Sequence, residues 1–327
     1  MSHAIRIYAT GGPEVMRWEE VGVGETASNE ARVRHEAVGL NFIDIYFRTG
    51  RYPLALPSGL GLEGAGVVEA VGSAVTESTG IRVGDRVAYA GGPPGAYAEV
   101  RNIPADRLVK LPETIDFKTA AAMMLQGMTA QYLLRRTYKV QAGDTILIQA
   151  AAGGVGLIVC QWAKALGATV IGTVSSDAKA ALAKAYGCDH PIVYTRENFV
   201  ERVKEITGGD GVPVVYDSVG ADTFMKSLDC LRPLGMMVTF GQSAGPVAPL
   251  DTQELSKRGS LFLTRPTLFT YVAQRADLLQ TSQELFDVVS SGKVKIEVNQ
   301  TYALKEAAQA HSDLEARKTT GSTILLP

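Results

Sequence analysis

The chain has 327 residues, which at about 100–200 residues per domain predicts two domains. A net charge of −2 gives no general positive field for binding nucleic acid or an anionic membrane. The three cysteines are scattered at Cys160, Cys188 and Cys230, so they form neither a disulfide framework nor a CxxC metal clip, and we expect a reducing, cytoplasmic location. No apolar run approaches the roughly 18 residues that span a bilayer, and the first residues show no secretory pattern, so we expect a soluble intracellular protein.

Residues 1 to about 115 are predicted to form a compact, mostly β domain. Residues 31–38 alternate apolar and polar side chains, which is typical of a half-buried strand. Residues 64–72 form a second strand bounded by glycine, and a third strand is expected within 83–89, after a Gly-Asp turn. Short strands at such close spacing favour a β-rich domain.

An alternation of helices and strands begins near residue 117. Residues 117–134 are rich in Ala, Met and Leu and are predicted to be one helix. The pattern then predicts strands at 145–149, 169–173, 192–194, 212–216 and 236–240, and helices at 155–166, 177–186, 198–207 and 223–231. This α/β alternation predicts a doubly wound parallel sheet with helices on both faces.

The pattern loosens again from about residue 265. We expect a helix at 277–290 and strands at 295–298 and 322–326. This tail is expected to return to the first domain. The predicted organisation is therefore an α/β domain of residues 126–265 inserted in a domain of residues 1–125 plus 266–327.

A glycine-rich turn, Ala150-Ala151-Ala152-Gly153-Gly154-Val155-Gly156, directly follows the first strand of the α/β part. The dinucleotide-binding fingerprint is GxGxxG between a strand and a helix. Gly153 and Gly156 hold its second and third glycine positions, whereas Ala151 replaces the first, so the tight turn must tolerate a Cβ. Gly153 would let the backbone approach a pyrophosphate, and the helix N-terminus would offer free N–H groups to it. This context favours a dinucleotide site over a glycine-rich helix start of another doubly wound fold.

The choice of cofactor depends on the end of the second strand of this part. An NAD site usually places Asp or Glu on the ribose about 20 residues further on. Asp177 has nearly that spacing, but it fits better in the first turn of the next helix, after a Ser176 N-cap. Ser175, Ser176 and Lys179 offer two hydroxyls and an ammonium to a 2′-phosphate, although Lys179 is also compatible with a solvated helix lysine. We therefore expect NADPH as the cofactor. A contact of Asp177 with the ribose would reverse this choice.

Several segments occur in the order found in a known family. They are GLNFID (39–44), GLEGAGVV (61–68), GDRV (84–87), GAYAE (95–99), the turn at 150–156, QWAKALGA (161–168), YDSVG (216–220) and TRP (264–266). Through these motifs the chain resembles the zinc-free, zeta-crystallin-like quinone oxidoreductases of the medium-chain dehydrogenase/reductase superfamily, and especially the bacterial ones. The resemblance implies an α/β fold in which a doubly wound (Rossmann) cofactor domain is inserted in a mostly β, GroES-like catalytic domain. It also implies reduction of quinones with NADPH and assembly into a homodimer.

The resemblance also bears on zinc. The zinc-dependent relatives carry a Gly-His-Glu motif whose His binds catalytic zinc, where this chain has Gly61-Leu62-Glu63. Their first zinc cysteine lies near Leu40-Asn41 of this chain, and their structural cysteine cluster has no counterpart. A catalytic zinc usually needs three Cys, His, Asp or Glu ligands, which Glu63 alone does not supply. We therefore expect no metal and no Lewis-acid alcohol dehydrogenase chemistry.

The cofactor contacts of the family transfer to this chain position by position. The loop beside the nicotinamide matches Asn41, Asp44 and Tyr46, and a helix residue near the same ring matches Thr129. The pyrophosphate turn matches Gly153, Gly154 and Val155, and the adenosine phosphate site matches Ser175, Ser176, Lys179 and Tyr194. Later contacts match Phe240, Gly241, Gln242, Ser243, Leu263, Arg265 and Arg317. The chain departs from the pattern at Gln126, where close relatives can carry Lys.

The expected reaction assigns few tasks to the protein, because the cofactor supplies the hydride and a quinone needs no metal. Tyr46 and Tyr52 are the best candidates to hydrogen-bond or protonate a quinone oxygen, although packing at the rim of a site explains them equally well. Asn41 is a candidate to orient the acceptor, with a turn-forming role as the alternative. Asp44 is expected to order its loop, and His35 is expected to be structural.

Two other functions stay open at this stage. One is NADPH-dependent reduction of an α,β-unsaturated carbonyl, which uses the same hydride and also needs no zinc. The other is a nucleotide-sensing or nucleic-acid-binding protein that has kept the fold. The near-neutral charge and the lack of a basic stripe with aromatic residues argue against nucleic acid.

Overall fold

The computed structural model describes residues 2–327, which fold into two compact units. Unit 1 comprises residues 2–128, Val272–Ser290 and Ile296–Pro327, and unit 2 comprises Thr129–Tyr271 and Ser291–Lys295. The chain thus leaves unit 1, builds unit 2 and returns. Within the described residues, no helix combines the length and apolar character that crossing a membrane requires.

Unit 1 is built on two β-sheets. The larger sheet has seven strands in the order β15-β16-β3-β5-β6-β8, with β7 also paired to β3, and the smaller has the order β2-β1-β4. The strands are β1 (Ser2–Ile7), β2 (Arg17–Val21), β3 (Glu30–Leu40), β4 (Ser58–Gly59), β5 (Glu63–Val71), β6 (Arg86–Ala90), β7 (Val100–Pro104), β8 (Val109–Lys110), β15 (Val298–Ala303) and β16 (Ser322–Leu326). The helices are α1 (Phe42–Arg48), α2 (Val75–Thr79), α3 (Phe117–Ala121), α11 (Arg275–Ser290) and α12 (Ala307–Glu315). The predicted β-rich character of this part is confirmed.

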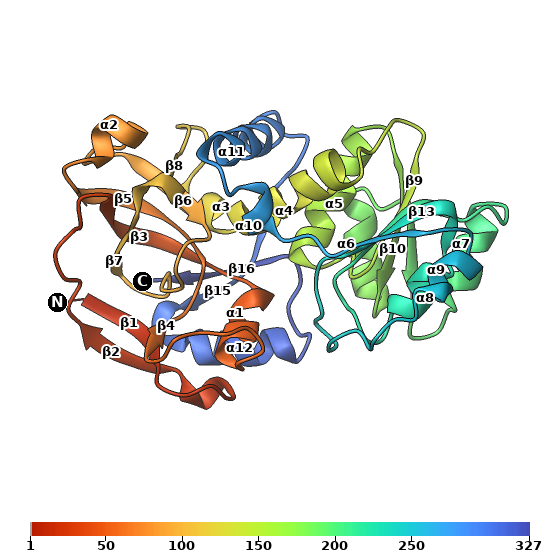
Figure 1. Cartoon of the computed structure of the whole chain (residues 1–327), viewed down its shortest axis with the longest axis horizontal. Coiled ribbons are helices and arrows are strands. Elements are labelled where there is room, and N and C mark those ends of the chain that lie inside the picture. The colour runs from red at the N-terminus through yellow and green to blue at the C-terminus, as the bar shows by residue number, and fades with distance from the viewer. Residues whose placement is uncertain (1) are drawn as a thin grey trace. The chain divides into compact units, whose positions relative to one another are not determined.

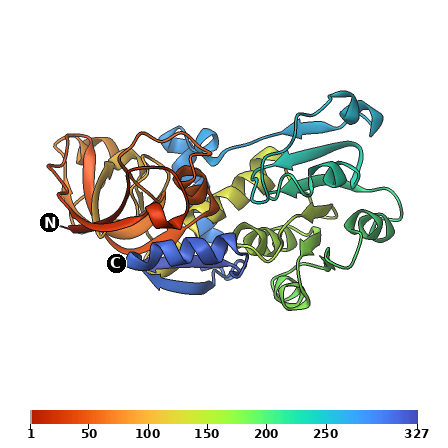
Figure 2. The ribbon, with the colours of Figure 1, turned by 90° about the horizontal axis from the view of Figure 1, so that it is seen from below.

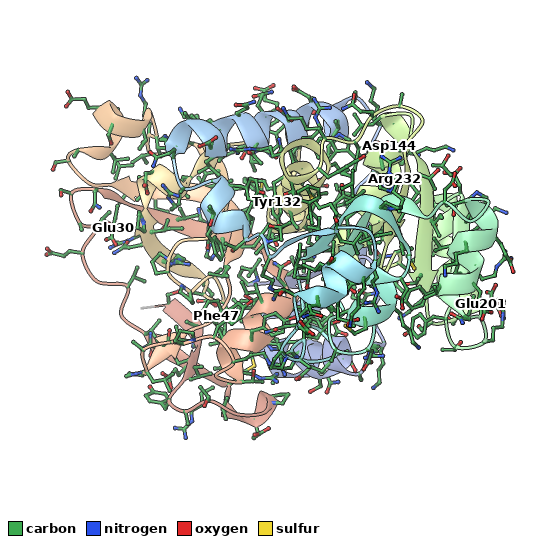
Figure 3. The ribbon with its side chains drawn as sticks, turned by 45° about the vertical axis from the view of Figure 1, so that its right-hand side comes forward. Glu30, Phe47, Tyr132, Asp144, Glu201 and Arg232 are labelled. Atoms are coloured by element: carbon green, nitrogen blue, oxygen red, sulfur yellow. The ribbon has the colours of Figure 1, made fainter. Side chains whose placement is uncertain are left out.

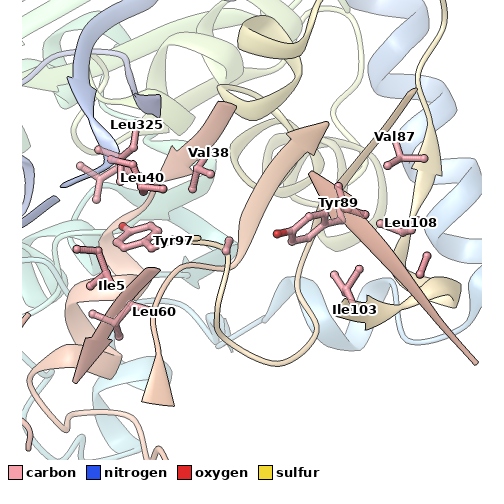
Figure 4. Packing of buried hydrophobic residues seen from close by; sticks show 14 of the residues in the cluster. Ile5, Val38, Leu40, Leu60, Val87, Tyr89, Tyr97, Ile103, Leu108 and Leu325 are labelled. Carbon is pink, nitrogen blue, oxygen red and sulfur yellow. The ribbon is translucent and has the colours of Figure 1, made fainter. Parts of the chain in front are cut away.

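The alternation in β3 explains how the core of unit 1 forms. Ala31, Val33, His35 and Ala37 are buried, while Arg34 and Glu36 between them are exposed, as the sequence pattern predicts. The core continues into neighbouring strands and loops and contains two fully buried tyrosines, Tyr89 and Tyr97 (Figure 4). The C-terminal elements α12 and β16, coloured blue, lie beside the red and orange N-terminal elements (Figure 2), and β16 pairs antiparallel with β3.

Unit 2 is a doubly wound parallel sheet, which confirms the predicted fold class. Its six strands have the order β11-β10-β9-β12-β13-β14 and all pair in parallel. Figure 1 shows α5 and α6 on one side of this sheet and α7, α8 and α9 on the other. The strands are β9 (Thr145–Ile148), β10 (Thr169–Val174), β11 (His190–Val193), β12 (Val212–Asp217), β13 (Leu231–Thr239) and β14 (Phe262–Thr264). The helices are α5 (Gly154–Ala165), α6 (Asp177–Ala185), α7 (Phe199–Ile206), α8 (Phe224–Leu228), α9 (Gln253–Lys257) and α10 (Leu268–Tyr271).

This strand order sets where a ligand can bind. Strand order reverses between β9 and β12, and open α/β sheets bind ligands at the carboxyl ends of their strands beside such a point. The glycine-rich turn follows β9 and therefore lies at this edge. Both faces of the sheet are covered, and Leu147, Val215 and Met237 pack under α7 and α8 in one buried cluster.

Two predicted elements are wrong. The single helix expected at 117–134 is divided into α3, α4 (Met124–Tyr132) and a π-helical segment at Leu133–Thr137. The strand expected at 295–298 begins only at its last residue, and β15 runs from Val298 to Ala303. In β15 the exposed side chains are polar, and the pairing to β16 begins at Val298, the last residue of the predicted segment.

Candidate functional site

The turn after β9 has the geometry that a phosphate-binding loop requires, but its strained residue is not the predicted one. Ala150 adopts a positive φ of 58°, in the left-handed region that favours glycine. The Gly153 N–H donates to the Ala150 carbonyl over 2.9 Å, which closes the turn. Helix α5 begins at Gly154 with Gly153 as its N-cap, so the backbone N–H groups of this end are available to an anion.

A contact across the sheet explains how Ala151 replaces the first glycine of the fingerprint. A Cβ placed on Gly172 of β10 would lie 2.5 Å from the Ala151 Cβ, so the absence of a side chain at Gly172 leaves room for that methyl. Gly156 has no room for a side chain, since a Cβ there would lie 2.3 Å from the Ala150 carbonyl oxygen. At Gly153 the corresponding distance to the same oxygen is 3.2 Å. The third glycine of the fingerprint lets the helix pack closely on the strand, and the short distance at Gly156 shows that this close packing is present.

The loop after β10 confirms the predicted N-cap. The Ser176 Oγ accepts a hydrogen bond from the Lys179 N–H over 3.3 Å, and Asp177 lies in the first turn of α6. The Asp177 carboxylate accepts two hydrogen bonds from Arg196, at 2.7 and 2.6 Å, and this pairing lowers the pKa of Asp177. The carboxylate that would bind a ribose in an NAD site is thus engaged by a guanidinium.

The remaining predicted nucleotide residues of unit 2 also follow its parallel strands. Tyr194 follows β11 and is 40% exposed. Phe240, Gly241, Gln242 and Ser243 follow β13, while Leu263 lies in β14 and Arg265 directly after it. Arg265 donates to the Thr239 and Gly241 carbonyls, at 3.2 and 2.7 Å, so it orders the loop after β13. Because the carboxyl ends of parallel strands share one edge, the structure brings these residues to the same edge as the glycine-rich turn.

A polar network that the sequence did not reveal stiffens this edge. The Gln149 side chain accepts from the Thr173 hydroxyl and donates to the Ser227 Oγ over 3.0 Å. Ser227 donates in turn to the Asp217 carboxylate over 2.9 Å. The same carboxylate accepts from the Gly220 N–H at 3.0 Å and thereby holds the loop after β12. The ends of β9, β10 and β12 are therefore linked by buried hydrogen bonds.

In unit 1, Asn41 is the residue that joins β3 to α1. Its backbone N–H donates to the Asp44 Oδ2 over 2.9 Å, which caps the first turn of α1. Asp44 is fully buried, and its role in ordering the loop is consistent with this bond. Burial raises the pKa of Asp44 to about 7, against the lowering effect of hydrogen bonds from Asn41 and Tyr97.

The Asn41 side chain lies in a second buried cluster. Its Nδ2 donates to the Glu63 Oε2 over 2.6 Å, and its Oδ1 accepts from the Gln126 Nε2 over 3.2 Å. The other oxygen of Glu63 accepts from the Leu125 N–H over 2.8 Å, at the start of α4. Ser322 of β16 donates to the Gln126 Oε1 over 2.8 Å, so both atoms of the amide are engaged. Desolvation raises the pKa of Glu63 to about 8.

A relay of buried side chains supports Asp44 from behind. The Tyr97 hydroxyl donates to the Asp44 Oδ2 over 2.9 Å and lies 3.0 Å from the His311 Nε2. Arg48 donates to the His311 Nδ1 over 3.2 Å, which assigns the neutral His311 tautomer with its proton on Nε2. Desolvation, followed by the charge of Arg48, lowers the pKa of His311 to about 3. Glu315 closes the relay through a bidentate pair with Arg48 at 2.8 Å.

The two candidate tyrosines, Tyr46 and Tyr52, belong to one group of aromatic side chains but differ in burial. Tyr46 is buried, and the rings of Phe42 and Tyr52 lie 5.5 and 5.2 Å from its ring. Tyr52 is partly exposed, and its hydroxyl makes no hydrogen bond to any residue of 2–327. The Tyr52 hydroxyl is therefore open to a ligand.

Other sequence candidates lie elsewhere in the described chain. Thr129 is buried in α4, and Arg317 is an exposed residue of unit 1 with a positive φ of 58°. His35 is structural as predicted, since its Nδ1 donates to the Ala98 carbonyl at 2.6 Å and desolvation lowers its pKa to about 4. A surface pocket lined by Asp144, Asp210 and Arg232 lies at the amino ends of the strands of unit 2, at the edge of the sheet opposite to the turn after β9. Figure 3 labels two of these residues, Asp144 and Arg232.

No metal-binding group exists among residues 2–327, in the sense of three or more His, Cys, Asp or Glu side chains that could hold one ion. Leu62, at the position where zinc-dependent relatives carry their His, is buried in the core.

The chain matches two family models, each over part of its length, and several described proteins over its whole length. An alcohol dehydrogenase GroES-like domain matches residues 27–113, and a zinc-binding dehydrogenase domain matches residues 154–279. A quinone oxidoreductase of Pseudomonas aeruginosa is 54% identical, with 100% of both chains covered. A 2-haloacrylate reductase of a Burkholderia species is 48% identical, with 100% of this chain and 99% of that protein covered. A crystal structure of Escherichia coli quinone oxidoreductase complexed with NADPH superposes with a TM-score of 0.97 at 50% identity, over 99% of this chain and 100% of that one.

Proposed function

The chain belongs to the quinone oxidoreductase family of the medium-chain dehydrogenase/reductase superfamily, and we propose from this that it reduces quinones with NADPH. The observation that carries the proposal is the full-length identity of 54% to a quinone oxidoreductase, together with a phosphate-binding turn at the switch point of the sheet. Residues 126–265 would bind the cofactor, and residues 1–125 with 266–327 would form the catalytic domain.

The fit of a dinucleotide rests on the backbone of the turn. At Gly153 a Cβ would contact only the Ala150 carbonyl, so the side of the turn that a pyrophosphate would approach is open. Gly153, Gly154 and Val155 would bind the pyrophosphate through N–H groups at the start of α5. The adenosine phosphate would contact Ser175, Ser176, Lys179 and Tyr194, and further contacts would come from Thr129, Phe240, Gly241, Gln242, Ser243, Leu263, Arg265 and Arg317.

The bound nicotinamide supplies the hydride, so the protein has to orient an electron-poor acceptor and manage its proton. We assign Asn41, Asp44 and Tyr46 to the nicotinamide side of the site. Asn41 is held on both atoms of its amide, which suits an orienting role. Tyr52 is the better candidate to donate to a quinone oxygen, because its hydroxyl has no partner within residues 2–327.

The reaction needs no metal under this proposal. The Glu63 carboxylate lies beside the Asn41 side chain, and its two oxygens accept hydrogen bonds from the Asn41 amide and the Leu125 N–H. Neither oxygen is therefore poised to bind an ion, and the amide of Asn41 is not a usual zinc ligand.

A specific relative favours one alternative, reduction of an α,β-unsaturated carbonyl. The 2-haloacrylate reductase at 48% identity carries a name that implies an activated double bond as acceptor. Initial rates with 1,4-benzoquinone and with a 2-alkenal, at equal NADPH, separate the two. We expect a higher kcat/KM for the quinone, and a clear preference for the alkenal would overturn the assignment.

The cofactor preference is tested by Lys179→Ala. The ammonium of Lys179 would contact the 2′-phosphate, which NADH lacks. Charge-assisted hydrogen bonds contribute about 1.5–3 kcal/mol, so we expect KM for NADPH to rise by about ten- to a hundredfold while KM for NADH changes little. An equal effect on both cofactors would remove the phosphate role from Lys179.

We further infer that the protein is a homodimer located in the cytoplasm. β14 is the outer strand of the sheet in unit 2, and its Phe262 and Leu263 side chains are 58% and 39% exposed. An exposed edge strand with apolar side chains is a template for pairing with a second copy. A monomer mass in sedimentation equilibrium would contradict the dimer.

A further inference from the structure

An ion pair in unit 2 joins two loops that the proposed cofactor site also uses. Asp177 opens α6, and Arg196 lies in the loop after β11. The Arg196 NH1 and NH2 groups donate to the two carboxylate oxygens of Asp177 over 2.7 and 2.6 Å. This fork-to-fork geometry is the most specific form of an arginine–carboxylate contact.

The two loops are fastened together at two further points. The Tyr194 N–H donates to the Val174 carbonyl over 3.1 Å, and the Thr195 hydroxyl donates to the Ser175 carbonyl over 3.3 Å. Ser175 and Tyr194 are both proposed to contact the adenosine phosphate. The Asp177–Arg196 pair is therefore the third link between the loops that would surround this phosphate.

The negative charge of Asp177 disfavours the binding of a 2′-phosphate. It is the acidic residue in the first turn of α6, directly after Ser176. A carboxylate there repels a phosphate and accepts hydrogen bonds from ribose hydroxyls, which is how NAD sites choose their cofactor. A carboxylate whose two oxygens are bound to a guanidinium repels a phosphate less and is a poorer acceptor for ribose hydroxyls.

We propose that Arg196 determines the cofactor specificity of this enzyme by binding the Asp177 carboxylate and so permitting a 2′-phosphate beside Ser175 and Ser176. The proposal rests on the proposed NADPH function. It assigns to Arg196 a role that depends on Asp177, so the two residues must act as a unit. Arg196 would be dispensable once Asp177 is uncharged.

The charges around the loops agree with this role. With the pair formed, Asp177 and Arg196 cancel, and Lys179 leaves the first turn of α6 with a positive charge that adds to its N-terminal dipole. Without Arg196, the Asp177 charge would offset that of Lys179. The hydroxyl of Ser176 still has its own proton to donate, because it only accepts from the Lys179 N–H.

The exposure of the pair makes the test clean. The Asp177 and Arg196 side chains are 74% and 57% exposed, and exposed ion pairs contribute little to stability. Variants at both positions should therefore fold, and their unfolding midpoints should match that of the unmodified protein. Arg202 of α7 is a matched control, because it forms exposed ion pairs with Glu205 of the same helix and with Glu197 but is not itself part of either loop.

The experiment measures kcat/KM with NADPH and with NADH, at saturating 1,4-benzoquinone, for Arg196→Ala, Asp177→Asn, the double variant and Arg202→Ala. One uncompensated charge near a phosphate dianion should lower the NADPH to NADH preference of Arg196→Ala by about tenfold. Asp177→Asn and the double variant should stay within about threefold of the unmodified enzyme, because neither leaves a free carboxylate. Arg202→Ala should leave the preference unchanged.

Each other outcome counts against the proposal. If the double variant is as poor with NADPH as Arg196→Ala, then Arg196 contacts the phosphate itself and does not act through Asp177. If Arg196→Ala keeps the original preference, the pair has no part in specificity. If the unmodified enzyme has the same kcat/KM with NADH as with NADPH, the proposed use of NADPH fails instead. This result is obtained before any variant is made.

Discussion

Glu63→Gln should alter how stability depends on pH, because it removes a carboxyl buried in unit 1. Both oxygens of Glu63 accept N–H donors, from Asn41 at 2.6 Å and from Leu125 at 2.8 Å. The replacement amide keeps the shape but presents an NH2 group to one of these donors. The variant should therefore lose about 1–3 kcal/mol of stability at every pH, from one unsatisfied buried group.

The pH-dependent part comes from the pKa of Glu63, which burial raises from 4.5 to about 8. The folded state then holds a proton at pH values where the unfolded state has released it. The stability that Glu63 contributes is fully present below pH 4.5 and is lost as the pH rises towards 8. The loss amounts to about 1.4 kcal/mol per pH unit, or roughly 2.7 kcal/mol between pH 5 and pH 7. Gln does not titrate, so the stability of the variant relative to that of the unmodified protein should rise by this amount between pH 5 and pH 7.

The assay is urea unfolding at pH 5, 6 and 7, followed by tryptophan fluorescence. The chain has two tryptophans, Trp18 in unit 1 and Trp162 in unit 2. In a Trp162→Phe background the signal therefore reports the unit that contains Glu63. Parallel curves, with the same difference in unfolding free energy at all three pH values, would refute the raised pKa and with it the account of this cluster.

Two other changes have equally definite outcomes. His311→Gln should shift the pH dependence of stability in the opposite sense. The pKa of His311 is lowered to about 3, so the unmodified protein loses about 1.4 kcal/mol of stability for each pH unit below 6.5, and the variant, which has no imidazole, does not. Unfolding at pH 4.5 and 6.5 measures this, and the same difference in unfolding free energy at both pH values would contradict it. Gly172→Ala should destabilise unit 2 by about 1–3 kcal/mol, because its Cβ would lie 2.5 Å from the Ala151 Cβ and 2.8 Å from the Cys188 Sγ. Adding Ala151→Gly should restore part of that loss, and strict additivity of the two changes in thermal unfolding would count against the contact.

The nucleotide edge of unit 2 was predictable because its signals are local. Alternating strands and helices, a glycine-rich turn and a Ser176 N-cap each occupy a few consecutive residues, and the structure has all three. The detail that failed was the strained residue, which is Ala150, while Ala151 is accommodated by Gly172 on the adjacent strand. Contacts across neighbouring strands leave no trace in a local pattern.

The broken helix at 117–134 has the same kind of cause. Its sequence contains no proline, and its one glycine, Gly127, lies inside α4. A new helix nevertheless begins at Met124, where the Leu125 N–H donates to Glu63, 62 residues away. A buried carboxylate thus serves as the cap for a helix start that the local sequence does not mark. Glu63 was known from the sequence only as part of a motif that lacks its zinc ligand.

The acceptor side of the site depends on the return of the chain to unit 1. Asn41 is ordered through Asp44, which Tyr97 supports, and Tyr97 is in turn held by His311. His311 lies in α12, 263 residues from its partner Arg48 in α1. No motif marks His311, so its place in the relay could not be inferred before the fold was known. The C-terminal segment therefore does more than complete a sheet, because it fixes the loop that we assign to the nicotinamide and the acceptor.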